Sequence, residues 1–356
     1  MEKVKERKFS KPSNFYSLST QEFGKWWTAK GMGIGPHKRL QRGIVRGSYQ
    51  AGPPSEHPEI SSHVLKSLKE EFTFDLPKIF ERRASKDGTI KYLFELEDGK
   101  KVESVAIPFH KKYTLCLSSQ VGCAMGCTFC FTGTQGLSRH LESHEIVGQY
   151  LAVWRDLNRD KAHPMTPNIV FMGQGEPLHN FEGLDKAIRY FMETPGLTLG
   201  PRQITVSTVG FLAGLERWSE LPSVNLAISL HSPFEEERTK LIPMNKAYSI
   251  ERIFEILRGL PWGRRKLINF EYLLLGEEND SKEHAKALAK LISEFPSLVN
   301  LIPFNPYPDS PYKRPSDEQV AKFKSWLVEE RVRTMVRTTK GDEILAACGQ
   351  LANKFK

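Results

Sequence analysis

Short apolar runs recur from residue 113 to the end of the chain, and segments with helical periodicity lie between most of them. The apolar runs predict strands at residues 113–117, 169–172, 204–207, 224–230, 268–275, 299–304 and 334–336. The periodic segments predict helices at residues 143–157, 183–193, 250–257, 283–295 and 317–329. Such alternation is typical of parallel βαβ units, so we expect a complete or partial barrel or an open doubly wound sheet. In either architecture, ligands bind at the carboxyl ends of the strands.

The first 112 residues have a different pattern, in which glycine and proline separate short helical pieces. An amphipathic helix is expected over residues 61–73. Two strands, at residues 90–96 and 101–107, flank Asp98-Gly99, which is a strong hairpin signal. The predicted parts are a basic helical accessory domain, a β-hairpin linker, an α/β core and a C-terminal segment, at residues 1–75, 76–112, 113–340 and 341–356.

Residues 1–47 contain eleven basic and three acidic side chains, and they therefore carry nearly all of the formal net charge of +9. Phe15, Tyr16, Trp26 and Trp27 are interleaved with these charges. Cationic and aromatic side chains together suit a phosphate backbone with exposed bases, which predicts RNA as a partner. A solvated basic tail before a small helical subdomain is an equal alternative until the catalytic motifs are considered.

A chain of 356 residues, 39% hydrophobic and 26% charged, has the composition of an ordinary soluble globular protein. No apolar run approaches the thickness of a bilayer, and no apolar h-region follows the charged N-terminus, so neither a membrane span nor a secretory signal is expected. Five cysteines, three of them clustered, favour a reducing compartment over a disulfide scaffold. We expect a cytoplasmic monomer.

Three of the five cysteines form a C-x3-C-x2-C triplet, Cys123, Cys127 and Cys130, in the loop after the first strand of the core. Three thiolates can hold three irons of a 4Fe–4S cluster and leave the fourth iron open for chemistry. A structural zinc site would require a fourth protein ligand. The triplet favours the cluster over a partial zinc site or inert thiols.

A second motif, Gly173-Gln-Gly175-Glu176-Pro177, directly follows the second strand. Glycine allows the backbone to approach a ligand closely, and a carboxylate at a strand end can hold an ammonium group. The alternative is a glycine-rich turn in which Glu176 is only the acid that begins a helix.

Three later strand ends carry Ser207, Ser229 with Leu230 and His231, and Asn305. Each could merely cap a helix or satisfy a turn. Together they supply hydroxyl, imidazole and amide groups that suit a ribose, a carboxylate and an adenine.

The remaining cysteines, Cys116 and Cys348, lie outside the triplet. A single cysteine in a late helical turn is usually a small apolar residue. If both reach the mouth of the cluster site, the two thiols could form a transient disulfide or hand over a methyl group.

These motifs resemble the RlmN/Cfr family of radical SAM methyltransferases that act on adenines in RNA. The resemblance runs from about Val102 to Ala352 and is carried by residues 115–130, 173–178, 228–231, 300–306 and 346–352. It implies a partial (β/α)6-type TIM barrel with a small N-terminal helical accessory domain and a β-hairpin extension.

The resemblance also implies roles for individual residues. Cys123, Cys127 and Cys130 would hold one 4Fe–4S cluster with an exchangeable S-adenosylmethionine (SAM) at the open iron. The residues implied to contact SAM are Gly175, Glu176, Ser207, Ser229, Leu230, His231 and Asn305.

Two SAM molecules are implied per turnover. One methylates Cys348, and the other yields a radical that activates this methyl group to join the adenine. Glu103 would then remove the ring proton, and Cys116 would release the methylated RNA by forming a disulfide with Cys348. An electron donor such as flavodoxin or ferredoxin is implied.

Residues 302–308 resemble the RlmN branch, which modifies carbon 2 of an adenine in 23S rRNA and often one in tRNA. His231-Ser-Pro is closer to the Cfr branch, which modifies carbon 8. We favour carbon 2. A zinc-dependent RNA-binding module and a radical SAM enzyme with a small-molecule substrate are the competing interpretations.

Overall fold

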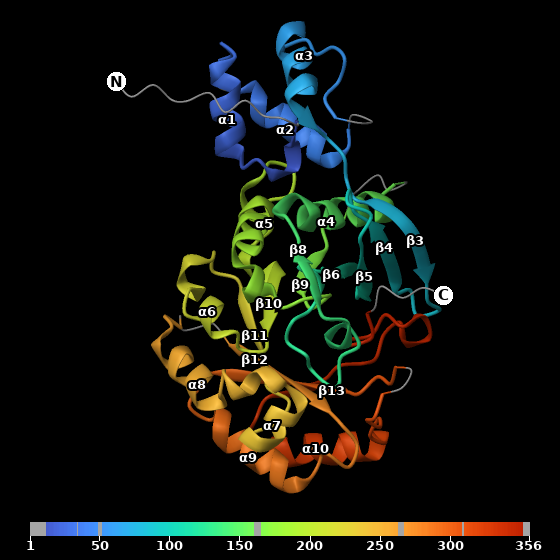
Figure 1. Cartoon of the computed structure of the whole chain (residues 1–356), viewed down its shortest axis with the longest axis vertical. Helices are drawn as coiled ribbons and strands as arrows, with labels where there is room; N and C mark the ends of the chain where they lie inside the picture. The colour runs from blue at the N-terminus through green and yellow to red at the C-terminus, as the bar shows by residue number, and fades with distance from the viewer. Residues whose placement is uncertain are drawn as a thin grey trace.

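The computed structural model describes residues 12–33, 35–48, 52–159, 165–262, 267–307 and 310–351, and a ten-stranded sheet runs through its middle (Figure 1). Seven consecutive strands of this sheet pair in parallel with their neighbours. They are β6 (Lys112–Cys116), β9 (Asn168–Phe171), β10 (Ile204–Thr208), β11 (Asn225–Ser229), β12 (Ile268–Leu274), β13 (Ser297–Pro303) and β14 (Thr334–Val336). No strand pairing among the described residues closes β14 onto β6, so the predicted partial barrel is confirmed.

The predicted helices of the core are present, with small shifts at their ends. They are α4 (Ser143–Leu157), α5 (Phe181–Glu193), α8 (Ile250–Gly259), α9 (Lys282–Ile292) and α10 (Asp317–Glu329). Ser249, Ser281 and Ser316 begin the last three, because each serine side chain accepts a backbone N–H of the first helical turn. Two further helices, α6 (Leu212–Leu215) and α7 (Glu235–Leu241), were not predicted.

The predicted hairpin at Asp98-Gly99 is confirmed, and it joins β4 (Ile90–Glu95) to β5 (Lys101–Phe109). A third strand, β3 (Lys78–Ala84), pairs with β4 and was not predicted, because it is an edge strand whose side chains are largely polar and exposed. β5 pairs antiparallel with β6, so this extension and the barrel share one sheet.

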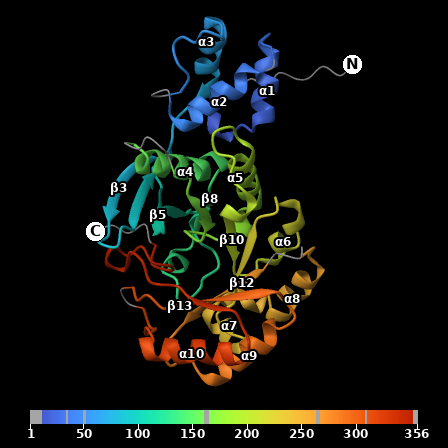
Figure 2. The same ribbon diagram turned by 180° about the vertical axis from the view of Figure 1, so that it is seen from behind.

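Three helices, α1 (Thr20–Ala29), α2 (Pro36–Arg46) and α3 (Ser62–Glu71), form the N-terminal end of the molecule next to α4 and α5 (Figures 1 and 2). The helix predicted over residues 61–73 ends at Glu71, because β2 (Phe72–Thr73) pairs with β1 (Ser13–Asn14).

The aromatic side chains that are interleaved with the basic residues are mostly part of a core. Phe15, Tyr16 and Trp27 are buried, and Trp26 packs against them while its indole N–H donates to Glu71. Residues 1–11, which hold part of the predicted basic segment, lie outside the described residues. The buried rings agree with the alternative of a small helical subdomain, since such a unit needs them to fill its interior.

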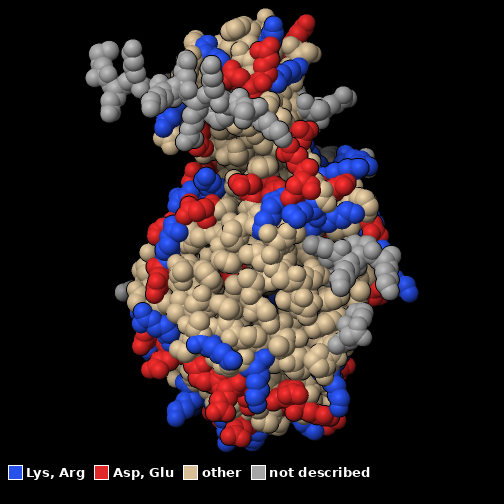
Figure 3. Space-filling model, viewed as in Figure 1, with Lys and Arg blue, Asp and Glu red and all other residues tan. Residues whose placement is uncertain are grey.

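The shorter elements are β7 (Gln120–Gly122), β8 (Leu137–His140) and 3-10 turns η1 (Phe15–Ser17), η2 (Thr132–Gln135), η3 (Pro177–Asn180), η4 (Pro201–Gln203), η5 (Trp218–Glu220), η6 (Pro243–Lys246) and η7 (Asp342–Ile344). None of the helices in the described ranges is long and apolar enough to cross a membrane. In Figure 3 charged side chains gather at the upper end, in a band across the waist and at the lower end, and the area between that band and the lower end is mostly uncharged.

Candidate active site

The cysteine triplet lines a cavity at the carboxyl ends of the barrel strands, with about 810 Å³ of space not filled by protein atoms. The cavity brings together nine of the site residues expected from the sequence: Cys123, Cys127, Cys130, Gly175, Glu176, Ser207, Ser229, His231 and Cys348. We call this the cluster cavity. Strand ends that are far apart in the chain therefore converge on the triplet, as expected for a barrel.

The loop that carries the triplet is held at its base by a close backbone contact. Gly122 has φ +79°, and a Cβ on it would lie 1.9 Å from the carbonyl oxygen of Gly136. The backbone N–H of Cys123 donates to the same carbonyl at 2.9 Å. Only glycine fits this position, since its backbone is left-handed and a side chain would meet the backbone of Gly136.

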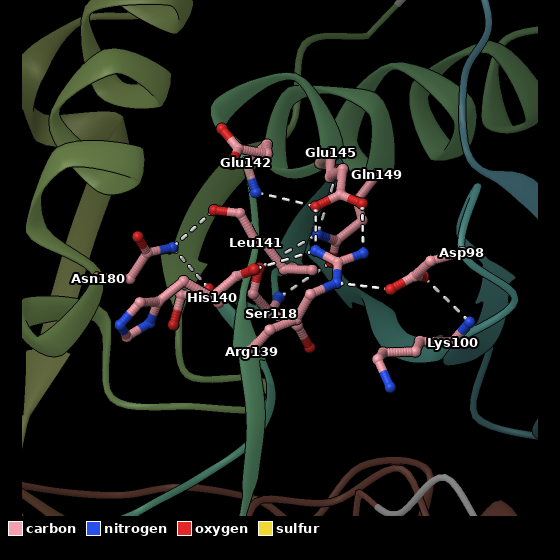
Figure 4. Close-up of polar contacts among 11 residues, drawn as sticks. Asp98, Lys100, Ser118, Arg139, His140, Leu141, Glu142, Glu145, Gln149 and Asn180 are labelled. Carbon is pink, nitrogen blue, oxygen red and sulfur yellow. Dashed lines mark hydrogen bonds and ion pairs between the residues drawn. The ribbon is translucent and has the colours of Figure 1, made fainter.

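The strand that closes the loop, β8, is fixed by an ion-pair network (Figure 4). Arg139 donates to both carboxylate oxygens of Glu145, at 2.7 and 2.8 Å, and to Asp98 at 2.8 Å. These hydrogen bonds raise the pKa of Arg139. Gln149 of α4 bonds both the N–H and the carbonyl of Ser118, which precedes the loop. The hairpin turn, β8 and α4 therefore brace the triplet from outside.

The three thiols are surrounded mainly by apolar side chains. Burial raises the pKa of Cys123 to about 12, that of Cys127 well above its usual value, and that of Cys130 as well. A bound cation reverses this effect and favours the thiolates. Within the described residues, no group of three or more His, Cys, Asp or Glu side chains is arranged to hold a single metal ion. The donor set of three thiols on one cavity wall suits an iron–sulfur cluster.

Glu176 has two structural contacts in addition to its place on the cluster cavity. Its Oε1 accepts from the N–H of Leu178 at 3.0 Å, so the side chain begins η3, and its Oε2 accepts from Val209 at 2.9 Å. Burial raises the pKa of this carboxyl to about 7, although these hydrogen bonds oppose the shift. The glycine before it, Gly175, has φ +101°, and a Cβ there would overlap the side chain of Gln120.

His231 is held as a neutral imidazole. Its Nδ1 accepts from the N–H of Leu273 at 3.0 Å, which leaves the proton on Nε2. Burial and the nearby guanidinium of Arg238 lower its pKa to about 3. The ring packs edge-on against Phe129 of the triplet loop, with centroids 4.7 Å apart. This side chain therefore offers a hydrogen bond without a charge.

Arg238, on the unpredicted helix α7, braces the strand ends from behind and was missed in the sequence. Its buried guanidinium donates to the carbonyls of Val209, Ser229 and Leu230 and to the side chain of Asn245. The only signal for it was an arginine eight residues after a strand, which is too weak to predict a role.

A second cavity adjoins the first and contains both outlying cysteines. Cys116 and Cys348 line it, and Cys348, Met172, Ile302 and Arg337 line both cavities. We call it the two-cysteine cavity. Burial and the neighbouring Cys348 raise the pKa of Cys116 to about 12, and Arg337 opposes this shift. Cys116 and Cys348 are therefore neighbours in the fold, although they lie far apart in the sequence.

Two charged residues between the cavities were also missed. Glu271 is buried on the wall of the cluster cavity, and its Oε1 accepts from Asn300 at 2.8 Å. Arg337 lies 3.7 Å from its other oxygen. Burial raises the pKa of Glu271.

The other predicted site residues do not line the cluster cavity. Asn305 lines the two-cysteine cavity, where its Oδ1 accepts from Arg314 and Thr339, each at 3.0 Å. Leu230 is fully buried, and Glu103 lines neither of these cavities. Glu103 is instead buried on β5, where its carboxylate lies 3.1 Å from the ammonium of Lys91.

Residues 117–290 match the Radical SAM superfamily. A protein from Sulfurimonas denitrificans described as dual-specificity RNA methyltransferase RlmN is 42% identical over 309 residues, which cover 83% of this chain and 86% of the relative. One from Campylobacter jejuni with the same description is 44% identical over 303 residues, covering 81% and 85%. The crystal structure of a radical SAM methyltransferase from Sphaerobacter thermophilus superposes with a TM-score of 0.88 at 34% identity, covering 96% of this chain and 100% of the other.

Proposed function

Since the chain belongs to the RlmN family of the radical SAM superfamily, we propose that it methylates carbon 2 of an adenine in 23S rRNA, with tRNA as a second substrate. Its relatives are described as dual-specificity RNA methyltransferases. The observation that carries the proposal is the meeting of Cys116 and Cys348 in a cavity that adjoins the triplet. An enzyme that passed a methyl group directly from SAM to RNA would need neither thiol.

Cys123, Cys127 and Cys130 are proposed to hold a 4Fe–4S cluster through their thiolates, with SAM in the same cavity. When bound, the reduced cluster supplies the electron that cleaves SAM to a carbon radical. Glu176 is proposed to hold the ammonium group of SAM, with Gly175 allowing close approach. The other proposed SAM contacts are Ser207, Ser229, the backbone of Leu230, and the Nε2–H of His231, with Asn305 from the adjoining cavity.

Cys348 is proposed to carry the methyl carbon between the two cavities. Its sulfur takes a methyl group from one SAM, and a second SAM is used to activate that methyl group. The carbon then bonds to adenine while still attached to the Cys348 sulfur. Cys116 attacks this sulfur, so that an S–S bond forms as the S–C bond breaks. The carbon keeps the electron pair of that bond and takes a proton to become the methyl group of the product, and an external reductant restores both thiols. The position of Cys348 on both cavities supports this sequence.

Glu103 is proposed as the base that takes the ring proton. It shares a face of β5 with Val105, which packs against Cys116, Ala346 and Leu351. Because the carboxylate lines neither cavity, the proton must reach it through a relay or after a rearrangement on RNA binding, as often holds for ligand-free sites.

The test is anaerobic reconstitution of the protein with iron, sulfide and methyl-labelled SAM, with 23S rRNA fragments and tRNA offered separately. Label at carbon 2 of adenine, found by mass spectrometry of the nucleosides, supports the proposal. Label at carbon 8 would assign the Cfr chemistry instead. Bound zinc with no SAM cleavage would indicate an RNA-binding module.

A further inference from the structure

The segment that carries Cys348 has little regular structure of its own. Residues 341–351, here called the Cys348 segment, contain a single 3-10 turn, η7. Gly341 and Leu345 both have left-handed backbones, with φ of +66° and +52°. A segment without a helix or strand is positioned by the groups around it. The neighbours of this segment therefore determine where the Cys348 thiol lies.

The turn between β3 and β4 contacts the start of this segment. Glu343 accepts hydrogen bonds from the hydroxyl of Ser85 at 2.9 Å and from the N–H of Lys86 at 2.7 Å. Asp87 in turn accepts from the N–H of Gly341 at 3.0 Å. The bonds from Lys86 and Ser85 lower the pKa of Glu343, so it is a carboxylate at neutral pH.

Lys91 contacts the middle of the segment from inside the protein. Its buried ammonium lies 3.1 Å from the carboxylate of Glu103 and donates to the carbonyl of Leu345 at 3.2 Å. A buried ammonium is stable only when it is paired and hydrogen-bonded, so this position is specified by both partners. Lys91 thus joins the proposed base to the backbone three residues before Cys348.

The far end of the segment contacts the loop that follows the triplet. The N–H of Phe131 donates to the carbonyl of Gly349 at 2.8 Å, and the hydroxyl of Thr132 donates to that of Leu351 at 2.7 Å. Gln350 donates to the carbonyl of Pro306 at 2.8 Å. Cys348 therefore lies between the triplet loop on one side and the β3–β4 turn with Lys91 on the other.

We propose that Lys91 and the turn at residues 85–89 form a clasp that fixes the position of the Cys348 segment relative to both cavities. Lys91 is then a positioning residue for the methyl-carrying thiol. This inference rests on the proposed function. In that reaction the Cys348 methyl must face activated SAM in one cavity and adenine in the other. A displacement of about 1 Å can slow such a step roughly 100-fold.

Loosening the clasp is expected to uncouple SAM cleavage from RNA methylation. SAM cleavage depends on the triplet and continues, whereas hydrogen abstraction from a misplaced Cys348 methyl fails. In reconstituted holoenzyme, Lys91→Met should raise the ratio of 5′-deoxyadenosine to methylated RNA roughly tenfold or more. Lys91→Arg keeps the charge and both contacts and should restore much of the coupling. A role in folding alone would lower both products together and leave the ratio unchanged.

Because Lys91→Met leaves Glu103 buried without this cation, a second variant loosens the clasp at its exposed end. Asp87→Asn combined with Glu343→Gln weakens the turn contacts without a buried charge, and it should raise the same ratio. The control is Lys78→Met, which removes a cation from β3 whose side chain is 76% exposed.

A chemical readout tests the clasp independently of RNA methylation. In protein that has not been exposed to SAM, so that Cys348 is a free thiol, the rate of its alkylation by iodoacetamide is followed by mass spectrometry of the Cys348 peptide. This rate should rise roughly tenfold in both clasp variants, because local opening exposes the thiol. Alkylation rates within twofold of wild type in both variants overturn the clasp, as does an unchanged product ratio. Faster alkylation in a protein that never methylates RNA would instead keep the clasp and overturn the proposed function.

Discussion

Cys116, at the end of β6, faces Cys348, near the end of the chain, across one small cavity. Burial and the neighbouring Cys348 raise the pKa of Cys116 to about 12, so the Cys116 thiol is almost fully protonated at neutral pH. A protonated thiol is a poor nucleophile. The arrangement keeps the proposed resolving cysteine close to its target while limiting premature attack on it.

Removing one or the other of these thiols should separate two steps of the proposed reaction. In Cys116→Ala, RNA should remain covalently joined to Cys348, because nothing cleaves the S–C bond. In Cys348→Ala no adduct should form, because the methyl carrier is gone. Denaturing gels with labelled RNA and mass spectrometry of the protein check both results. If neither substitution impairs methylation, the two-cysteine mechanism is wrong.

Two glycines near the triplet offer a matched comparison. Gly122 and Gly136 both have left-handed backbones, with φ of +79° and +68°. An added Cβ would meet a carbonyl oxygen at Gly122, but nothing within 4 Å at Gly136. Gly122→Ala should therefore lose most of the bound iron and sulfide, whereas Gly136→Ala should lose much less and be destabilised by roughly 1–3 kcal/mol through backbone strain alone. Equal cluster content in the two variants would show that this contact does not shape the site.

The buried carboxyl of Glu176 predicts a pH dependence of stability. Its pKa is raised from 4.5 to about 7, so between these values the folded protein binds more protons than the unfolded chain. The free energy of unfolding should therefore fall by roughly 3 kcal/mol as the pH rises through this window, and the contribution is constant above it. Denaturant titrations of cluster-free protein from pH 4.5 to 8 measure the slope, which Glu176→Gln should reduce.

The same carboxyl predicts the pH dependence of SAM binding. If Glu176 holds the ammonium group, SAM affinity in the holoenzyme should rise about tenfold from pH 6 to pH 8, because the carboxyl ionises in that range. His231 stays neutral throughout, since its pKa is about 3. A wild-type slope that persists in Glu176→Gln would assign the effect to another group.

Arg238, which is buried and donates to backbone carbonyls, should contribute far more to stability than an exposed arginine that forms ion pairs. Arg238→Met removes donors from three buried carbonyls and should lower the free energy of unfolding by roughly 3 kcal/mol or more. Arg217→Met breaks exposed pairs with Glu182 and Glu220 and should have a much smaller effect, because exposed ion pairs contribute little to stability. Similar losses in chemical unfolding would mean that Arg238 does not brace the strand ends.

The elements that were predicted are those with a strong local signal. The run Ile268–Leu274 is a strand because a short apolar segment in this fold is buried on both faces. The helix Glu235–Leu241 was missed because six of its seven side chains are polar, so it has no apolar periodicity. The strand Lys78–Ala84 was missed for a similar reason, since an edge strand with charged side chains resembles a loop.

Among the site residues, the triplet and Glu176 could be found because their chemistry lies within a few consecutive residues. The roles of Lys91, Glu271 and Arg337 could not, because each depends on a partner from another strand or segment. Asn305 illustrates the same limit, since its strand end was identified correctly but the cavity that it lines was not.

The sequence by itself determined the cysteine spacing, the glycine-rich strand end and the alternation of strands and helices, because each depends on neighbouring residues and on backbone preferences. Only the tertiary structure decided that Cys348 lies beside Cys116 and the triplet, and that Lys91 joins Glu103 to the Cys348 segment. Those contacts form because the barrel brings its strand ends together and because the Cys348 segment packs against β4 and the β3–β4 turn. Pairings between distant segments of this kind depend on how the whole chain packs, and no local pattern encodes them.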